Sequence, residues 1–467
     1  MSSRIVQTYT TAKDTELRLT AAPQQPLRRG EPSGKSPTVR IHPERRKQTL
    51  LGFGGAFTEA MADALSRVGP DRRREALEAY FHPDHGIGYT FCRTHINSCD
   101  FSLENYSYCD VPGDVELEHF DISRDTRTLI PLIRDAGTIR GRPLTLFASP
   151  WSPPAWMKTS GRMNHGGRLK REYYPVWARY FVRYIRAYRD QGIPIWGVTI
   201  QNEPLAVTKW DNCVYTHAEE REFVKVLARA FHDHGLDDVK IIVWDHNKDV
   251  LKERTDVIFA DLDAYDATWG VGFHWYGPTD TESTIDDSAL DYVHKCYPDK
   301  KLIFTEGCNP VRHAEGLSGM LGAWWTGEKY ARHVIADLNH HTAAWVDWNM
   351  VLDERGGPNH VGNFCDAPII ADTVNDRLVY ESSFYCLGHF SRFIPPGSTC
   401  LGSEVDAAEL QAVAAERPDG AIVLVVLNTG DRPVCAEARL NDAAWWIEMP
   451  PRSIQTHVVP HKRGPGK

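Results

Sequence analysis

Two glutamates stand at the ends of apolar runs, where they could act as a pair. The run "IWGVTIQNEP" at 195–204 ends with Asn202 and Glu203 before a proline, and "KLIFTEGC" at 301–308 carries Glu306. A carboxylate at the end of a buried strand is costly to desolvate unless a neighbouring group uses its charge. Two carboxylates that flank a glycosidic bond can hydrolyse it, with retention when they are roughly 5–5.5 Å apart and with inversion when they are farther apart. One of them must be kept protonated and the other ionised.

The runs that carry these glutamates belong to a longer series of candidate strands. Between about residues 48 and 390 apolar runs alternate with amphipathic helical stretches. The runs cover 51–61, 89–97, 143–151, 195–204, 240–247, 267–276, 301–308 and 342–350. Eight strands, each followed by a helix and covered on both faces, predict a (β/α)8 (TIM) barrel of the α/β class. The ends of its fourth and seventh strands lie on one rim, so Glu203 and Glu306 can face each other.

Polar and aromatic residues gather at the ends of these runs, where a barrel would point them into its active site. They are Trp151, Asn202, Glu203, His274, Tyr276, Glu306 and Trp348. An irregular fold would scatter such residues. The clearest helical stretch, 172–190, instead carries aromatic residues at three- and four-residue spacing, which we interpret as core packing.

The two ends of the chain differ from the middle. From about 397 short β-like runs appear, among them "LQAVAAE", "AIVLVVLN", "VCAEARL" and "SIQTHVV", and residues 3–42 also read as strands. Neither piece has enough strands for a stable sheet alone. We therefore predict an all-β sandwich built from both termini, with 1–47 and 395–467 forming the sandwich and 48–394 the catalytic barrel.

Composition limits the function classes. The chain has 467 residues, a net charge of −9 and no long basic run, which argues against a nucleic-acid partner. No apolar run is long enough to span a bilayer, and the N-terminus lacks a signal-peptide pattern. Ten cysteines without CxxC and twenty histidines without HExxH indicate no metal site. We expect a cytoplasmic enzyme without metal or cofactor and without stable membrane insertion. The sequence makes no prediction of its oligomeric state.

An ordered set of motifs resembles a known family. It includes "GFGGAFTEA", "NSCDFSLENYSYCD", "ASPWSPPAWMKT", "NEP", "HWY", "DWNMVLDERGGPNHVGNF" and "GHFSRFIPPGS", spread over nearly the whole predicted barrel. The chain resembles glycoside hydrolase family 30 and, within it, the glucosylceramidase-like (acid β-glucosidase) branch. The resemblance implies a retaining mechanism with Glu203 as general acid/base, Glu306 as nucleophile and Asn202 bound to the sugar 2-hydroxyl.

The resemblance also implies residues that bind the sugar. Asp100 matches an aspartate that binds glycone hydroxyls, although an Asx-turn is the alternative for it. Trp151 and Trp348 match tryptophans that line the glycone pocket, and either could simply belong to the core. Asn363 matches an asparagine near the sugar hydroxymethyl group, with a loop turn as its alternative.

Three further positions match residues around the nucleophile. Arg93 matches an arginine near it, whose charge should keep Glu306 ionised. His274 and Tyr276 match residues that surround and orient the nucleophile, with a structural role as the alternative for His274.

These observations predict a retaining exo-β-glucosidase that acts on small β-glycosides or glycolipids by double displacement. The alternatives keep the mechanism and change the sugar, as in a β-xylosidase, a β-fucosidase or a β-1,6-glucanase, or replace hydrolysis by transglycosylation. A non-catalytic carbohydrate-binding barrel is disfavoured because both glutamates are present.

Overall fold

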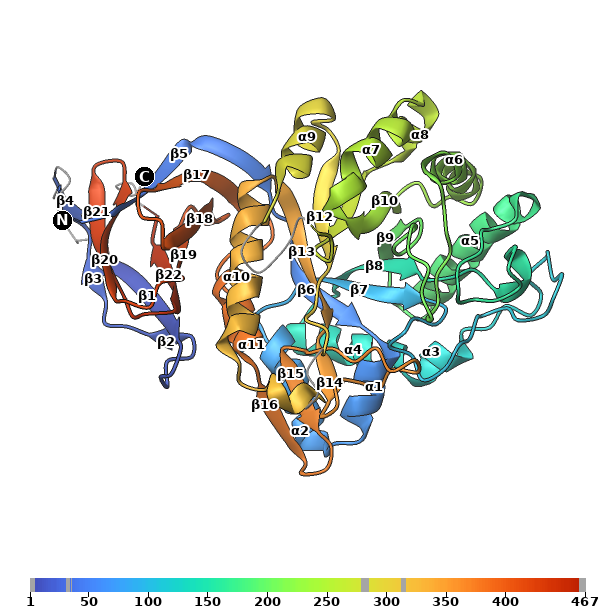
Figure 1. Cartoon of the computed structure of the whole chain (residues 1–467), viewed down its shortest axis with the longest axis horizontal. Helices are drawn as coiled ribbons and strands as arrows, with labels where there is room; N and C mark the ends of the chain where they lie inside the picture. Colours follow the sequence, from blue (N-terminus) through green and yellow to red (C-terminus); the bar gives the residue numbers. More distant parts are fainter. Residues whose placement is uncertain (1–4, 31–33, 35, 279–284, 312–315, 462–467) are drawn as a thin grey trace.

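The computed structural model describes residues 5–30, 34, 36–278, 285–311 and 316–461. Figure 1 shows two parts side by side: a β-rich part that holds both ends of the chain, and a barrel of strands with helices outside it. Helices α10 and α11 lie where the two parts meet.

The larger part is a closed barrel of parallel strands in the order β10-β11-β12-β13-β6-β7-β8-β9. Its strands are β6 (Gly52–Phe57), β7 (Phe91–Ile96), β8 (Thr145–Pro150), β9 (Ile195–Thr199), β10 (Lys240–Asn247), β11 (Gly270–His274), β12 (Lys301–Glu306) and β13 (Thr342–Asn349). Each strand lies within one of the eight apolar runs. The structure therefore confirms the predicted (β/α)8 barrel.

The helices of the barrel pack outside its strands. They are α1 (Glu59–Ser66), α2 (Pro70–Phe81), α3 (Ser123–Arg127), α4 (Leu129–Arg140), α5 (Tyr174–Asp190), α6 (His217–Asp233), α7 (Leu251–Phe259), α8 (Leu262–Ala267), α9 (Ser288–Cys296), α10 (Trp324–Asn339) and α11 (Ser382–Ser391). Short 3-10 turns span Ala155–Met157, Arg171–Tyr173, Lys248–Val250 and Gly316–Gly319. On α5 the rings of Trp177, Tyr180 and Tyr184 are fully buried, so the aromatic stripe is core packing.

The second part is a β-sandwich to which both ends of the chain contribute. Its strands are β1 (Ile5–Ala12), β2 (Thr20–Ala21), β3 (Gln25–Pro26), β4 (Arg28–Arg29), β5 (Thr38–Thr49), β17 (Thr399–Val405), β18 (Leu410–Glu416), β19 (Ile422–Asn428), β20 (Val434–Leu440), β21 (Ala443–Met449) and β22 (Ser453–Val459). N-terminal β1 pairs with C-terminal β22, and β5 lies between β17 and β20. A separate apolar core, with Val39, Leu424 and Trp445, fills the sandwich. This architecture confirms the sandwich predicted from both termini.

A small third sheet follows the last barrel strand and was not predicted. It consists of β14 (Val351–Asp353), β15 (Ile369–Asp372) and β16 (Arg377–Tyr380). The loop between β14 and β15 carries Asn363 towards the barrel rim. Within the described residues, no helix is both long and apolar enough to cross a membrane.

Candidate active site

Arg93 forms the centre of a hydrogen-bond network at the C-terminal rim of the barrel. Its side chain, on β7, is fully buried. One terminal nitrogen donates to Glu306 Oε2 at 2.6 Å, and the other donates to Asn202 Oδ1 and Asp245 Oδ2, both at 2.8 Å. Nε donates to Ser149 Oγ at 3.0 Å. The guanidinium thus fixes groups at the ends of several neighbouring strands, and its planar fork of donors suits this geometry.

Glu203 and Glu306 reach the rim in different ways. Glu306 is the last residue of β12, whereas β9 ends at Thr199, four residues before Glu203. Glu203 therefore stands in a turn beyond its strand, which corrects the expectation that it ends the fourth strand. Its φ of 47° is sparsely populated for a residue with a Cβ. The Glu203 amide donates to the Asp245 carbonyl at 2.9 Å, which holds this turn in place.

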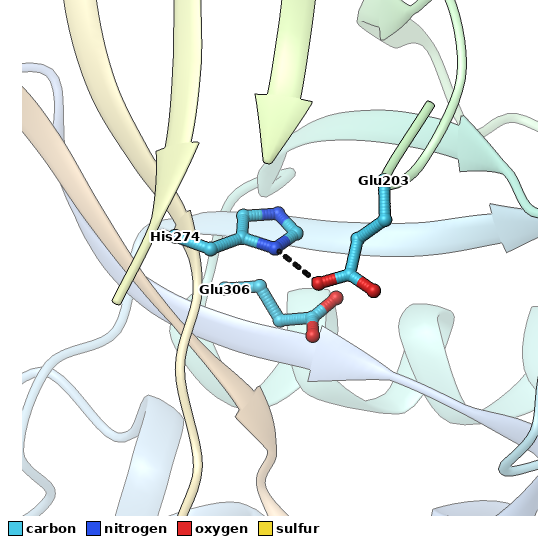
Figure 2. Close-up of side chains that lie close together, drawn as sticks. All are labelled: Glu203, His274 and Glu306. Atoms are coloured by element: carbon cyan, nitrogen blue, oxygen red, sulfur yellow. Dashed lines mark hydrogen bonds and ion pairs between the residues drawn. The ribbon is translucent and has the colours of Figure 1, made fainter. Parts of the chain in front are cut away.

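The two glutamates converge on His274, as Figure 2 shows. One oxygen of each carboxylate and one ring nitrogen of His274 all lie within 4.8 Å of one another. His274 Nδ1 is 3.3 Å from Glu203 Oε1, and its Nε2 is 2.9 Å from Asp245 Oδ1. The resemblance implied that His274 surrounds Glu306; it lies within 4.8 Å of that carboxylate, and its hydrogen bonds go to Glu203 and Asp245. This approach is compatible with the roughly 5–5.5 Å carboxyl separation at which one carboxylate can act as a nucleophile and the other as an acid/base; an inverting pair is wider because it leaves room for a water molecule.

The proton distribution in this cluster follows from burial and charge. Burial alone would lower the pKa of His274, but the charge of Glu306 and hydrogen bonds to Asp245 and Glu203 raise it to about 9. Burial opposes ionisation of Glu203, yet the hydrogen bond from His274 and the charge of that imidazolium hold its pKa below the ordinary value. At neutral pH the pair therefore consists of an imidazolium beside a carboxylate, with one proton between them.

The pKa of Glu306 is raised above its ordinary value, because burial outweighs the opposing charges of His274 and Arg93. From the sequence we expected Arg93 to keep Glu306 ionised. The charge of Arg93 does act in that direction, but burial, which cannot be read from the motif, acts more strongly.

The Glu203, His274 and Glu306 side chains are also close enough to hold a metal ion. A cation there would compete with the guanidinium of Arg93, 2.6 Å from Glu306, and with the imidazolium of His274. The positive charge already present makes these carboxylates poor metal ligands, so the absence of a metal requirement stays our prediction.

A pocket of about 280 Å³ opens over the two carboxylates. Its lining is Asp100, Trp151, Asn202, Glu203, Trp210, His246, Asn247, Tyr276, Glu306, Cys308, Pro310, Trp348, Asn363 and Cys365. The sequence-predicted substrate-binding residues are all among them, while Arg93 and His274 lie behind this lining.

One end of the pocket combines a buried carboxylate with an aromatic wall. Asp100 accepts hydrogen bonds from Asn363 Nδ2 at 3.0 Å and Asn359 Nδ2 at 3.3 Å, and burial raises its pKa to about 7. The rings of Trp151 and Trp348 stack with centroids 5.0 Å apart. Hydroxyl acceptors beside a flat apolar surface are what a sugar ring requires.

Several residues of the site were not predicted from the sequence. Asp245 and His246 lie in the run 240–247, so the strand-end rule that identified Glu203 could have found them. Tyr276, which the resemblance implied lies around the nucleophile, lines the pocket together with Glu306, and its hydroxyl donates to Cys308 Sγ at 3.3 Å. Nothing in the spacing of Cys308 and Cys365 indicated that both would line the pocket.

Comparisons with known proteins agree along most of the chain. Residues 50–394 match the glycosyl hydrolase family 30 TIM-barrel domain, and residues 397–457 match the β-sandwich domain of that family. Lysosomal acid glucosylceramidase of Mus musculus is 36% identical over 86% of this chain and 79% of its own length. An endo-1,6-β-D-glucanase of Aspergillus fumigatus is 26% identical over 94% of this chain and 91% of its own. The crystal structure of SrfJ from Salmonella typhimurium matches with a TM-score of 0.91 and 34% identity, covering 98% of this chain and 100% of that one.

Proposed function

This chain is a glycoside hydrolase that belongs to glycosyl hydrolase family 30, and on that premise we propose that it is a retaining exo-β-glycosidase that releases terminal β-glucosyl residues. The observation that carries the proposal is that one oxygen of Glu203 and one of Glu306 lie within 4.8 Å of each other, which fits the roughly 5–5.5 Å carboxyl separation of a retaining pair better than the wider separation of an inverting pair. The pocket above them would take the terminal sugar.

In the first step Glu306 attacks the anomeric carbon and Glu203 gives a proton to the glycosidic oxygen. The bond to the leaving alcohol breaks, and a glycosyl ester forms on Glu306. His274 holds the proton that Glu203 transfers, because its Nδ1 lies 3.3 Å from Glu203 Oε1 and its pKa is about 9. The proton is therefore held one hydrogen bond away from the acid that uses it.

In the second step Glu203 takes a proton from water, which attacks the anomeric carbon and releases Glu306. Two inversions give net retention. Asn202, held by Arg93 at 2.8 Å, would bind the 2-hydroxyl, and this contact should strengthen in the transition state.

The choice of a glucosyl unit rests on the end of the pocket. Asp100, braced by Asn363, would accept two adjacent ring hydroxyls, while Trp151 and Trp348 would cover the sugar face. The mouse relative's name supports a β-glucoside, including a glycolipid such as a glucosylceramide. The Aspergillus relative favours a second candidate, β-1,6-glucan. β-Xylosides and β-fucosides are further candidate substrates, because the same two-glutamate mechanism would cleave them.

The test is a panel of aryl β-glycosides with glucose, xylose, fucose and galactose, together with β-1,6-glucan, followed by NMR of the first-formed anomer. We expect the β-glucoside to be cleaved fastest and β-glucose to appear first. Initial α-glucose would overturn the retaining assignment. Added alcohol acceptors measure how much glycosyl-enzyme goes to transfer instead of water.

Two variants assign the glutamates. Glu306→Ala should lose turnover and regain part of it with azide, giving an inverted glycosyl azide. Glu203→Ala should lose about 10²–10⁴-fold on alkyl glucosides but much less on substrates with good leaving groups, because those need no general acid. Glu253→Gln, exposed on α7, is the matched control. Full activity in either Ala variant would contradict these roles.

A further inference from the structure

A pair of thiols lies in the wall of the catalytic pocket. All ten cysteines are free thiols, and those at 308 and 365 are only 5% and 3% exposed. Their sulfurs are 3.3 Å apart, and both residues line the cavity over Glu306. The mechanism proposed above makes no use of either thiol.

Hydrogen bonds align the two sulfurs in one direction. The Tyr276 hydroxyl donates to Cys308 Sγ at 3.3 Å, the Cys308 thiol donates to Cys365 Sγ, and the Cys365 thiol points to the Asn363 carbonyl at 3.8 Å. The hydrogen bond from Cys308 and burial raise the pKa of Cys365 well above its ordinary value. Cys365 therefore keeps its proton, and Cys308 is the member of the pair that the Tyr276 hydroxyl contacts.

The backbone holds the two segments side by side. The Asp366 amide donates to the Asn309 carbonyl at 2.8 Å, and the Val311 amide donates to the Phe364 carbonyl at 3.0 Å. A disulfide requires sulfurs about 2.05 Å apart, so they must approach by roughly 1.3 Å. Both thiols lie in loops beyond the barrel strands, where a shift of that size is accessible.

We propose that Cys308 and Cys365 form a reversible oxidation site that hydroperoxides convert to a disulfide, which slows catalysis in the adjoining pocket. The Cys308 sulfur attacks one peroxide oxygen, the O–O bond breaks, the thiol proton passes to the departing oxygen, and a sulfenic acid and water form. The Cys365 sulfur then displaces the second oxygen as water. Two thiols and one hydrogen peroxide thus give one disulfide and two waters.

The expected effect on turnover rests on the proposed function and follows from the position of the pair. Cys308 is two residues beyond Glu306, and Cys365 is two residues beyond Asn363, which braces Asp100 at 3.0 Å. Drawing the sulfurs together moves the Asn363 loop relative to the nucleophile. A displacement of about 1 Å in a positioning group can reduce turnover by about 10²-fold.

The experiment uses the reduced full chain in a Cys296→Ser/Cys435→Ser background, which removes the two exposed thiols. The protein is treated with hydrogen peroxide, remaining thiols are alkylated, and peptides are mapped without reduction. We expect a peptide pair joined through Cys308 and Cys365. Aryl-glucoside hydrolysis should fall by about tenfold or more, and dithiothreitol should restore it.

Two further variants isolate the pair, each compared with its own reduced state. Cys365→Ser should abolish the linked peptide and the reversible loss, whereas Cys386→Ser, a buried control on α11, should keep both. The proposal would be overturned if the reversible inhibition persisted in Cys365→Ser. It would also be overturned if peroxide formed no linked peptide in the parent protein, or formed it without changing the rate of hydrolysis. The peptide map decides the site even if no glycoside is cleaved, so failure of the proposed function would be seen separately.

Discussion

Arg93 shows how one residue sets the charge of the whole site. Its guanidinium is fully buried and contacts Glu306, Asn202 and Asp245 at 2.6–2.8 Å. Burial would raise the pKa of Asp245, but the charges of Arg93 and His274 hold it far below its ordinary value. Asp245 therefore stays ionised and pairs with both cations. Their combined charge keeps the cluster near balance, which makes its burial tolerable.

His274 should determine the alkaline limb of the pH profile. In the wild-type chain the proton is held by the His274–Glu203 pair up to the His274 pKa of about 9. In His274→Gln the proton must stay on Glu203 alone, and a buried carboxyl releases its proton at lower pH than this imidazolium. The alkaline limb of kcat/KM should move down by more than about one pH unit. Alkyl glucosides should lose more rate than activated aryl glucosides.

His246→Gln is the control for this prediction. His246 also faces Glu203, with Nε2 3.9 Å from Oε1, but burial lowers its pKa, so it is neutral near pH 7. Its replacement should leave the alkaline limb nearly unchanged. An unchanged limb in His274→Gln would show that the imidazole does not hold the catalytic proton.

The residues of the site could be predicted from the sequence better than their protonation. Motifs and strand ends identified the residues that the fold brings to one rim, including Arg93, Asn202 and Glu306. They missed Asp245, although it lies near the end of the run 240–247, where the strand-end rule applies. They also could not give the partner of His274 or the net pKa shift of Glu306. Those depend on distances and burial that only the folded barrel sets.

At the scale of elements, long apolar runs predicted strands correctly, whereas short strands were not predicted. All eight barrel strands lie inside predicted runs, because strands covered on both faces must be continuously apolar. β9 is shorter than its run, since its pairing with β10 ends at Thr199. The strands β14 and β15 that flank the Asn363 loop were missed, because three or four residues give no readable period.

The contact between β6 and β7 allows no side chain at Gly54. A Cβ there would lie 1.8 Å from the carbonyl oxygen of Phe91. Because that obstacle is backbone, Gly54→Ala should force the two strands apart and destabilise the fold by at least about 4 kcal/mol. Urea unfolding and soluble yield measure the loss.

Gly137→Ala is the control for Gly54→Ala, because it makes the same substitution where a side chain has room. Gly137 lies in α4, and a Cβ on it would lie 3.8 Å from the carbonyl oxygen of Arg142, its nearest neighbour outside the helix. This change should instead stabilise the chain by about 0.5–1 kcal/mol, because alanine restricts the unfolded chain and favours helix. Equal stabilities for the two variants would contradict the close approach of β6 and β7.

At the scale of the whole molecule, one helix of the barrel joins both ends of the chain. His389 on α11 contacts the Thr456 hydroxyl on β22 at 2.8 Å and the Thr11 hydroxyl on β1 at 2.9 Å. The barrel thus packs against a sheet that neither terminus could complete alone. The sequence predicted the shared sandwich from a strand count, but it held no indication of this buried junction.

The His389 junction should make the molecule sensitive to acid. Burial lowers the pKa of His389 to about 3, whereas an unfolded histidine has a pKa of about 6.5. Below pH 6.5 the unfolded chain therefore binds a proton that the native chain does not. The stability contributed by neutral His389 is present above pH 6.5 and is lost as the pH falls towards 3. The loss is about 1.4 kcal/mol per pH unit.

Comparison with His389→Gln isolates this contribution from the other titrating groups. The variant should be less stable than the wild type at pH 7.5 by about 1–3 kcal/mol, because two buried hydroxyls lose a well-placed partner. Since glutamine does not titrate, the gap should close as the pH falls from 6.5 to 4.5. His232→Gln, at a side chain 78% exposed, should show only a small gap, because an exposed ion pair contributes little stability. Urea unfolding at each pH measures both gaps. A gap for His389→Gln that stays constant down to pH 4.5 would mean that the junction accepts the proton in the native state. The barrel and sandwich would then stay joined in acid.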